Sequence, residues 1–267
     1  MIKKFEEYLK LVGNSPDTIR AYCSDVKNCI KQDIISPDLK SFNQNKFLTA
    51  SQSSQTKKRW VASLTKYAKF CIHEGIITEN PVIDVIIPKT KPKEPRIADF
   101  KETQNLIEKI EDLEIKTILS ILSTTGCRIS SLINIKVEDI SDSVILFTQA
   151  KGSKPYKSVL NDNTKKLLDL YTLTNKKSPN DFLFSNKINM PYSTSALRIK
   201  LRRYLGQNYK NPHSHRHGFA TYLLQKQITL PIIQQAMNHT NINTTMHYLH
   251  ILPENIKKEF MEKNIFS

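Results

Sequence analysis

The stretch NPHSHRHGFAT, residues 211–221, places three histidines and an arginine within five positions. In a strand, His213, His215 and His217 would point to one face, as metal ligands do. In a helix, His213 and His217 would form an i, i+4 pair that suits zinc. The glutamate of the H-E-x-x-H motif is missing, because position 214 is Ser. A metal site therefore remains a possible interpretation of this stretch, although the stretch lacks the H-E-x-x-H motif.

The same stretch predicts the start of a helix. Asn211 is a favoured N-cap residue, and Pro212 suits the first helical position. On such a helix His213 and Arg216 share a face in the first turn. Free backbone N–H groups and the helix dipole favour an anion there, so the pattern favours phosphate over metal.

Two further stretches carry residues that could act on a phosphate. Residues 237–250, MNHTNINTTMHYLH, contain His239 and Tyr248, and residues 124–140, TTGCRISSLINIKVEDI, contain Arg128 shortly after Gly126. Each is a weak signal alone, since a lone arginine is usually a surface charge and a lone tyrosine usually packs in a core.

Together and in this order the stretches resemble the tyrosine recombinase family, also called the phage integrase or lambda integrase type, most closely its small Xer-like members. TTGCRISSL is similar to the family box T-G-x-R-I-S-E-L, HSHRH to H-x-x-R-H, and MNHTNINTTMHY to L-G-H…T-T-x-x-Y. QAKGSK resembles the turn that carries the family's lysine. The N-terminal half is also similar, in FEEYLKLVGNSPDTIRAYCSDVKNCI and YAKFCIHEGIITENPV. The resemblance places the catalytic residues at Arg128, Lys151, His213, Arg216, His239 and Tyr248.

The resemblance implies cleavage and rejoining of DNA through a 3′-phosphotyrosyl link. Two arginines suit this chemistry, because Arg128 and Arg216 can clamp the non-bridging oxygens of a phosphodiester with bidentate hydrogen bonds. Tyr248 would be the nucleophile. A free tyrosine has a pKa of about 10, so it needs a proton acceptor, and His213 is the candidate.

The remaining two residues complete the expected reaction. Lys151, on a hairpin turn, is the candidate general acid for the leaving 5′-oxygen, and His239 would donate a further hydrogen bond to the phosphate. The covalent link conserves the energy of the broken bond, so we expect no cofactor, no metal and no ATP.

Two positions depart from the family pattern. Ser131 stands where the family usually has Glu, so the support of the arginine pocket loses a charge. Asn238 stands where the family has Gly. If that position is left-handed, Asn is the best substitute for glycine.

The overall charge agrees with a polyanionic partner. The 267 residues carry 40 Lys and Arg against 25 Asp and Glu, a net charge of +15. Residues 1–95 hold 16 basic against 10 acidic residues, and residues 96–267 hold 24 against 15, so both halves are basic. Four scattered cysteines and the lack of a long apolar run predict a reduced, cytoplasmic protein with no membrane span. The cysteines are Cys23, Cys29, Cys71 and Cys127.

The proline-rich segment PKTKPKEPR, residues 88–96, predicts a linker between two domains. Residues 1–88 read as a helical domain, with one helix that starts at Ser15-Pro16 and another over about 54–74. In residues 97–267 we expect helices, a hairpin of strands at 143–149 and 156–160, and helices from about residue 163 onward. The predicted fold is thus mainly α with a small β-sheet. By resemblance, it is a SAM-like core-binding domain (1–88), a linker (89–96) and an α/β catalytic domain with a C-terminal tail helix (97–267).

The expected partner is double-stranded DNA. By resemblance, the tail at residues 250–267 would pass into a neighbouring subunit and build a tetramer on two DNA sites. The basic cluster of Lys57, Lys58 and Arg59 is either a DNA contact or a solvated helix face. Two alternatives stay open: a non-catalytic DNA-binding protein, suggested by Ser131, and a metal-dependent nuclease built on His213, His217 and His239.

Overall fold

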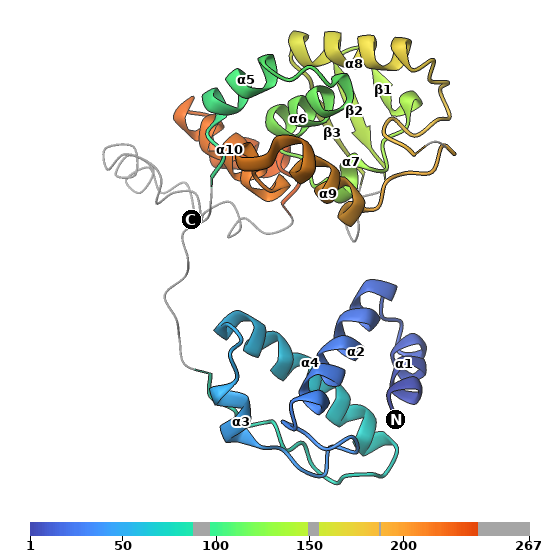
Figure 1. Ribbon diagram of the computed structural model, residues 1–267, viewed down its shortest axis with the longest axis vertical. Helices are drawn as coiled ribbons and strands as arrows, with labels where there is room; N and C mark the ends of the chain where they lie inside the picture. The colour runs from blue at the N-terminus through green and yellow to red at the C-terminus, as the bar shows by residue number, and fades with distance from the viewer. Residues whose placement is uncertain (88–96, 149–154, 187, 240–267) are drawn as a thin grey trace. The chain divides into compact units, whose positions relative to one another are not determined.

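The computed structural model describes residues 1–87, 97–148, 155–186 and 188–239. The chain divides into two compact units, Met1–Lys93 and Glu94–Ser267 (Figure 1). The expected linker, the turn with Lys151 and the segment with Tyr248 lie outside the described residues. A search of the described helices finds none with the length and apolar character that crossing a membrane requires.

The N-terminal unit is built from four described helices: α1 (Ile2–Leu11), α2 (Pro16–Lys31), α3 (Gln44–Thr49) and α4 (Ser54–His73). The predicted start of α2 is confirmed, because the Ser15 side chain accepts the N–H of Thr18. The predicted helix at about 54–74 is confirmed as α4. Helix α2 packs against α4 and α1, around fully buried aromatic side chains that include Phe5, Trp60 and Tyr67. These rings fix the core of the unit.

The basic cluster at the start of α4 is partly used by the fold itself. Arg59 donates to the carboxylate of Asp25 at 2.6 Å, and Asp25 is 1% exposed. The Lys57 ammonium donates to the carbonyl oxygen of Leu48 at 2.5 Å. Lys58 is exposed. Two of the three cations thus have partners within the N-terminal unit, which weakens the DNA-contact interpretation of this cluster.

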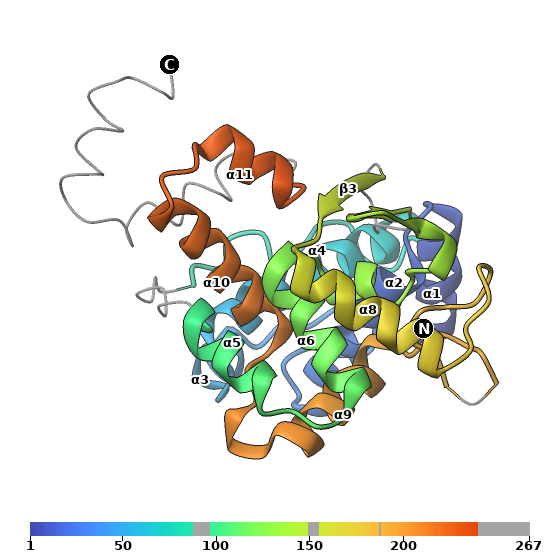
Figure 2. The same ribbon diagram turned by 90° about the horizontal axis from the view of Figure 1, so that it is seen from above.

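The second unit is mainly helical, as predicted. Helix α6 (Leu113–Thr125) is its centre and packs against α5, α8 and α10 (Figures 1 and 2). Its Ile115, Ile118, Ile121 and Leu122 are buried, so the helix has apolar contacts on several sides. The other described helices are α5 (Phe100–Glu108), α7 (Ile129–Leu132), α8 (Asp162–Thr174), α9 (Thr194–Leu205), α10 (Pro212–Gln225) and α11 (Leu230–Ala236), with short 3-10 turns η1 (Val137–Asp139) and η2 (Gly206–Asn208).

A small antiparallel sheet completes this unit, in the order β1 (Ile140–Ser141), β2 (Val144–Phe147), β3 (Tyr156–Val159). The predicted strands at 143–149 and 156–160 are confirmed as β2 and β3. Strand β1 was not predicted, because two residues are too few to show an alternating pattern. Phe147 lies opposite Tyr156, and their rings stack at 4.7 Å. This pair anchors β3 to the core.

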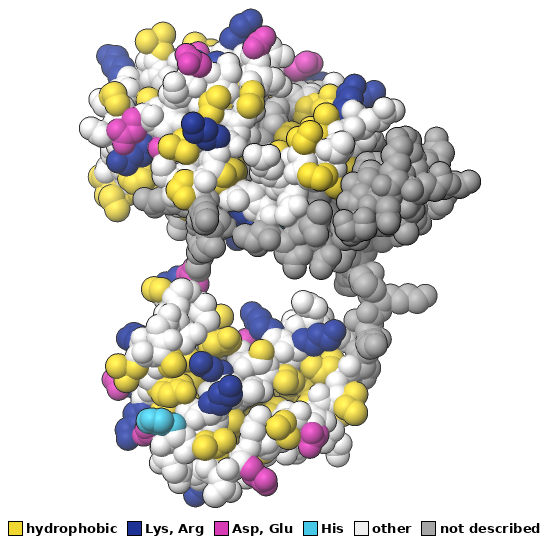
Figure 3. Space-filling model, turned by 180° about the vertical axis from the view of Figure 1, so that it is seen from behind, with side chains coloured by type: hydrophobic (Ala, Val, Ile, Leu, Met, Phe, Trp, Pro, Cys, Tyr) yellow, Lys and Arg dark blue, Asp and Glu magenta, His cyan; other side chains and the backbone are white. Residues whose placement is uncertain are grey.

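The surface drawn in Figure 3 carries basic side chains on both units. On this face Lys and Arg are interspersed with acidic and hydrophobic side chains and do not form one continuous patch. Net charge therefore does not show where a binding site lies, and the site must be located from the geometry of the side chains.

Candidate phosphate-binding site

The site begins at Gly126, which ends α6 with a φ of +60°. A Cβ atom at this position would lie 2.5 Å from Phe219 Cδ1 and 2.9 Å from Met237 Sδ. Both the left-handed backbone and the crowding require glycine here. The turn leaves the Gly126 carbonyl oxygen free to accept a hydrogen bond from another helix.

That donor is Arg216 on α10. The predicted start of α10 is confirmed: Asn211 is its N-cap, and its side-chain oxygen accepts the N–H of Ser214 at 3.0 Å. Arg216 is only 5% exposed. Its Nη1 donates to the Gly126 carbonyl oxygen at 2.6 Å, and its Nη2 donates to the carbonyl oxygen of Met237. The guanidinium thus joins the end of α6, helix α10 and the segment after α11.

Helix α10 also rests on the backbone of Ala98. The Ala98 N–H donates to the carbonyl oxygen of Ser214 at 3.1 Å. A Cβ atom on Gly218 would lie 1.9 Å from the Ala98 carbonyl oxygen, so only glycine permits this approach. The contact fixes the first two turns of α10, which carry His213 and Arg216.

Arg128 lies at the start of α7 and reaches the same segment. Its Nη1 and Nη2 both lie 3.4 Å from the carbonyl oxygen of Asn238. Asn238 has a φ of +47°, so this position does have the left-handed backbone at which Asn is the best substitute for Gly. The two arginines therefore meet at adjacent carbonyl groups, those of Met237 and Asn238.

The two predicted histidines lie beside this arginine pair. The pKa of His213 is lowered by burial, and then by the charges of Arg216, Arg198 and Arg128. The pKa of His239 is lowered to about 4 by burial, and then by Arg216 and Arg128. Both imidazoles are therefore neutral at pH 7, so each ring carries one N–H donor and one nitrogen that can accept a hydrogen bond. The structure brings together Arg128, His213, Arg216 and His239, the four predicted residues that it describes.

Two other residues of this neighbourhood were not among the catalytic residues that the resemblance predicted, although His217 was considered as a metal ligand. Arg198, exposed on α9, lies close enough to His213 to lower its pKa. His217 is half-buried, and its pKa is lowered by burial and then by His213 and Arg216. The i, i+4 spacing of His213 and His217 was the available signal for His217. Arg198 lies among several other basic residues, and nothing in the sequence distinguishes it from them.

His215, by contrast, is a packed core residue. It is 3% exposed, and neither ring nitrogen has a hydrogen-bond partner. Burial lowers its pKa to about 4, with a smaller contribution from Lys210. Its environment agrees with a packing role.

The alternative metal site is not assembled. Within 1–87, 97–148, 155–186 and 188–239, no three His, Cys, Asp or Glu side chains are grouped as metal ligands. His213, His217 and His239 therefore do not form a ligand set among themselves. The geometry favours anion binding at the arginine pair.

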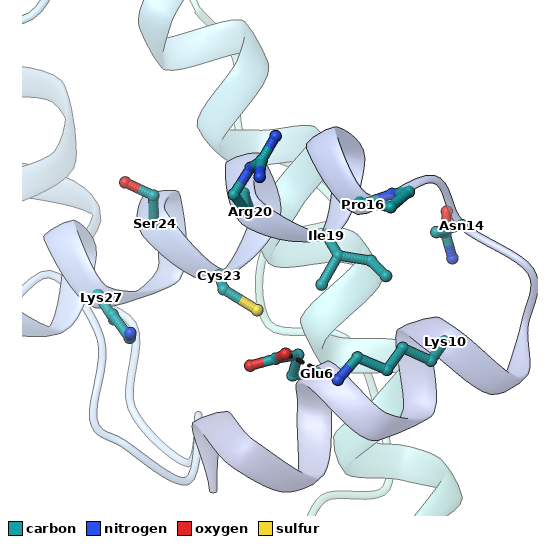
Figure 4. Close-up of a pocket in the computed structure, with 9 residues that line it drawn as sticks. All are labelled: Glu6, Lys10, Asn14, Pro16, Ile19, Arg20, Cys23, Ser24 and Lys27. Carbon is teal, nitrogen blue, oxygen red and sulfur yellow. Dashed lines mark ion pairs between the residues drawn. The ribbon is translucent and has the colours of Figure 1, made fainter. Parts of the chain in front are cut away.

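The N-terminal unit has a concave surface of a different kind. A groove of about 760 Å³ lies between α1 and α2, lined by Lys10, Arg20 and Lys27 and by the apolar side chains Ile19 and Cys23 (Figure 4). Glu6 pairs with Lys10 at 2.9 Å on its floor. Its lining includes one arginine and no histidine, so it lacks the paired groups found in the second unit.

Comparison with known proteins identifies the family of this site. Residues 95–255 match the phage integrase family. The chain belongs to that family. A tyrosine recombinase of Pseudothermotoga lettingae is 31% identical over 271 residues, which cover 95% of this chain and 94% of that protein. Tyrosine recombinase XerC of Bacillus licheniformis is 28% identical and covers 96% of this chain and 93% of its own length.

Solved structures of phage integrase family members share the fold. A lambda integrase dimer bound to a COC′ core site superposes with a TM-score of 0.72 at 18% identity, over 92% of this chain and 75% of that one. XerH site-specific recombinase bound to a palindromic difH substrate superposes with a TM-score of 0.70 at 18% identity, over 97% and 93%. At these identities the likeness supports the phage integrase fold alone.

Proposed function

We propose that the protein is a site-specific DNA recombinase that cuts and rejoins DNA through a 3′-phosphotyrosyl intermediate. The observation that carries the proposal is the meeting of Arg128 and Arg216, from distant parts of the chain, with His213 and His239 beside them. Paired arginines with neutral histidines suit the transfer of a phosphoryl group.

The arginines would stabilise the charge that develops on the two non-bridging oxygens of the phosphate. A guanidinium stays protonated throughout and offers planar, paired donors. The backbone carbonyls of Gly126, Met237 and Asn238, to which the two arginines donate, are neutral acceptors, and they orient the guanidinium groups without adding a full negative charge.

Tyr248 would supply the nucleophile. Its oxygen attacks the phosphorus, the bond to the 5′-oxygen breaks, and the leaving oxygen takes a proton from Lys151. His213, held neutral, would accept the tyrosine proton, and His239 would hydrogen-bond the phosphate. Attack by a 5′-hydroxyl on the phosphotyrosine reverses the step and rejoins a strand without ATP or a metal.

Double-stranded DNA is the proposed substrate and partner. The basic balance of both halves of the sequence supports it, as does the DNA bound in the related XerH and lambda integrase structures. We further propose that the active form is a tetramer on two DNA sites, with the segment 250–267 as the contact between subunits. No small-molecule cofactor is needed, and a cytoplasmic location would give access to the DNA.

The test is covalent capture of DNA. The purified protein is incubated with a pool of randomised duplexes that carry a nick in one strand, so that cleavage releases a short fragment and traps the adduct. Adducts that survive SDS are recovered, and their DNA is sequenced and resynthesised as a defined substrate. We expect wild-type protein to form the adduct in the presence of EDTA and Tyr248→Phe to form none.

A non-catalytic DNA-binding protein is the second candidate, favoured by the uncharged Ser131 beside Arg128. The same experiment separates the two. DNA retained in a native gel with no adduct from any duplex of the pool would support the second candidate against the first.

A further inference from the structure

The turn that follows α11 carries a buried donor with no acceptor. The side-chain amide nitrogen of Asn238, Nδ2, is buried and makes no hydrogen bond within the described part of the chain. A buried polar atom without a partner is costly, so native proteins keep few of them, and each needs an explanation. The groups around this amide indicate which kind of partner it lacks.

The two arginine side chains that meet this turn bring donors and no acceptors. The carbonyl oxygen of Met237 accepts from Arg216, and that of Asn238 accepts from both terminal nitrogens of Arg128 at 3.4 Å. Because Arg128 contacts the backbone of the same residue, the Asn238 side chain and this guanidinium are close neighbours. A ligand with several acceptor oxygens would therefore suit both groups.

Hydrogen bonds hold the backbone of the turn in place. The N–H of Asn238 donates to the Gln235 carbonyl oxygen at 3.0 Å, and the N–H of His239 donates to the Gln234 carbonyl oxygen at 3.0 Å. The Gln234 side chain donates in return to the His239 carbonyl oxygen at 3.1 Å. The Asn238 amide can therefore rotate about its own side-chain bonds while the carbonyl that Arg128 contacts stays in place.

We propose that Asn238 is a further phosphate-binding residue, whose side-chain amide donates a hydrogen bond to a non-bridging oxygen of the scissile phosphate beside Arg128. The inference rests on the proposed function. A phosphate brings acceptor oxygens and negative charge, which suit a neutral donor placed next to guanidinium groups. A glycine would provide the same left-handed backbone but no donor, so the side chain adds a contact that the backbone cannot make.

A purely conformational role predicts a different outcome. If Asn238 only occupies a left-handed position, Asn238→Gly should keep the wild-type cleavage rate, because glycine adopts that backbone readily. If the amide binds the phosphate, cleavage should slow although the backbone is unchanged. The cleavage rate of this variant therefore distinguishes the two roles.

The experiment compares Asn238→Gly and Asn238→Asp with wild type at saturating concentrations of the defined nicked duplex. We expect cleavage by Asn238→Gly to fall about tenfold to a hundredfold, the effect of one hydrogen bond to a charged group. Asn238→Asp should lose at least as much, because a carboxylate of the same shape replaces the donor and repels the phosphate.

Asn189→Gly is the matched control. Asn189 also has a left-handed backbone, with a φ of +54°, and its side-chain amide donates to Asp181 at 2.6 Å in an exposed turn. The same exchange of asparagine for glycine is thus made away from the arginine pair, and its cleavage rate should equal that of wild type.

Sulfur substitution at the scissile phosphate tests the contact itself. The position of this phosphate is read from the sequenced adduct, and two further duplexes each carry sulfur, a weaker acceptor, in place of one non-bridging oxygen. We expect the difference between wild type and Asn238→Gly to shrink to about twofold or less on one of these duplexes and to stay about tenfold or more on the other, because only one oxygen accepts from the amide.

A wild-type rate in Asn238→Gly, or an equal loss on all three duplexes, would overturn the inference while leaving the proposed function intact. A wild-type protein that forms no adduct on any duplex overturns the proposed function and the inference together. The two failures are distinguishable, because the second is seen without any variant.

Discussion

Arg216 donates from Nη1 to the carbonyl oxygen of Gly126 across 2.6 Å, although 90 residues separate the two in the sequence. The bond depends on a left-handed glycine that ends α6 and on a buried guanidinium from α10. Neither residue can change without moving the other. The relationship makes the geometry of the candidate phosphate site sensitive to a residue that has no side chain.

Gly126→Ala should therefore impair both folding and cleavage. The new methyl would meet Phe219 and Met237 in a strained backbone, at a cost of about 1–3 kcal/mol for overpacking plus about 1 kcal/mol for the backbone. Gly75→Ala is the control, because Gly75 has a φ of +67° and open space around it. Thermal unfolding and adduct formation measure the effects. Equal losses in both variants would show that crowding at Gly126 has no consequence.

Arg216→Lys should reduce cleavage by orders of magnitude, about 100-fold or more, because an ammonium cannot donate to Gly126, Met237 and a phosphate from one plane. Rates are compared at equal DNA occupancy. Arg20→Lys, at an exposed arginine paired with Asp17 on the other unit, should retain the wild-type rate. Near-normal cleavage by Arg216→Lys would contradict the clamp.

Acid should destabilise the protein through its buried histidines. The folded pKa of His215 and of His239 is about 4, below the value of 6.5 for a free histidine. Their stabilising contribution is therefore complete above pH 6.5 and is lost as the pH falls toward 4, since the unfolded chain binds the protons first. The slope is at most about 1.4 kcal/mol per pH unit for each histidine.

His215→Leu isolates one of these contributions. The variant should lose less stability than wild type between pH 7 and pH 5, as measured by calorimetric unfolding of the full chain. His73→Leu, at an exposed histidine, should keep the wild-type dependence. A parallel pH response in His215→Leu would mean that His215 does not contribute to the acid effect.

Deletion of residues 254–267 should leave a protein that binds one duplex but assembles poorly on two. The segment contains Phe260, Met261, Ile265 and Phe266, four apolar side chains that a contact between subunits would bury. Analytical ultracentrifugation with the defined duplex measures the assembly. A tetrameric complex at full abundance would refute the role proposed for this segment.

Salt should weaken DNA binding steeply, because a basic protein releases counterions from the phosphates that it contacts. The slope of log Kd against log salt concentration should be close to one for each phosphate contacted. The same slope is measured for Lys58→Ala, which removes one exposed cation, and is compared with that of wild type. A flat salt response would contradict extensive backbone contact.

The sequence predicted the starts of helices well, because the residues that begin a helix are neighbours in the sequence. Asn211-Pro212 and Ser15-Pro16 each place a cap and a proline side by side, and both begin helices. The sequence left the backbone at Asn238 as a condition, and the structure meets it with a left-handed φ of +47°. The family boxes located all four of the predicted residues that meet in the site.

Long-range features could not be predicted. The carbonyl partners of Arg216 follow from how α6, α10 and α11 pack. Every residue has a backbone carbonyl, so the residue type does not show which carbonyl will accept the hydrogen bond. Arg59, in a cluster that resembled a DNA contact, bonds the buried Asp25 instead. In each case the decisive contact joins residues far apart in the sequence.

The contact between Ala98 and α10 has a mechanical consequence. Residue 98 stands at the entrance to the second unit, and its backbone both donates to Ser214 and fills the space opposite Gly218. Tension applied to the chain at this point is borne first by the turns that hold His213 and Arg216. The catalytic rate of this protein is therefore expected to change when a pulling force is applied at Ala98, and optical tweezers can apply that force.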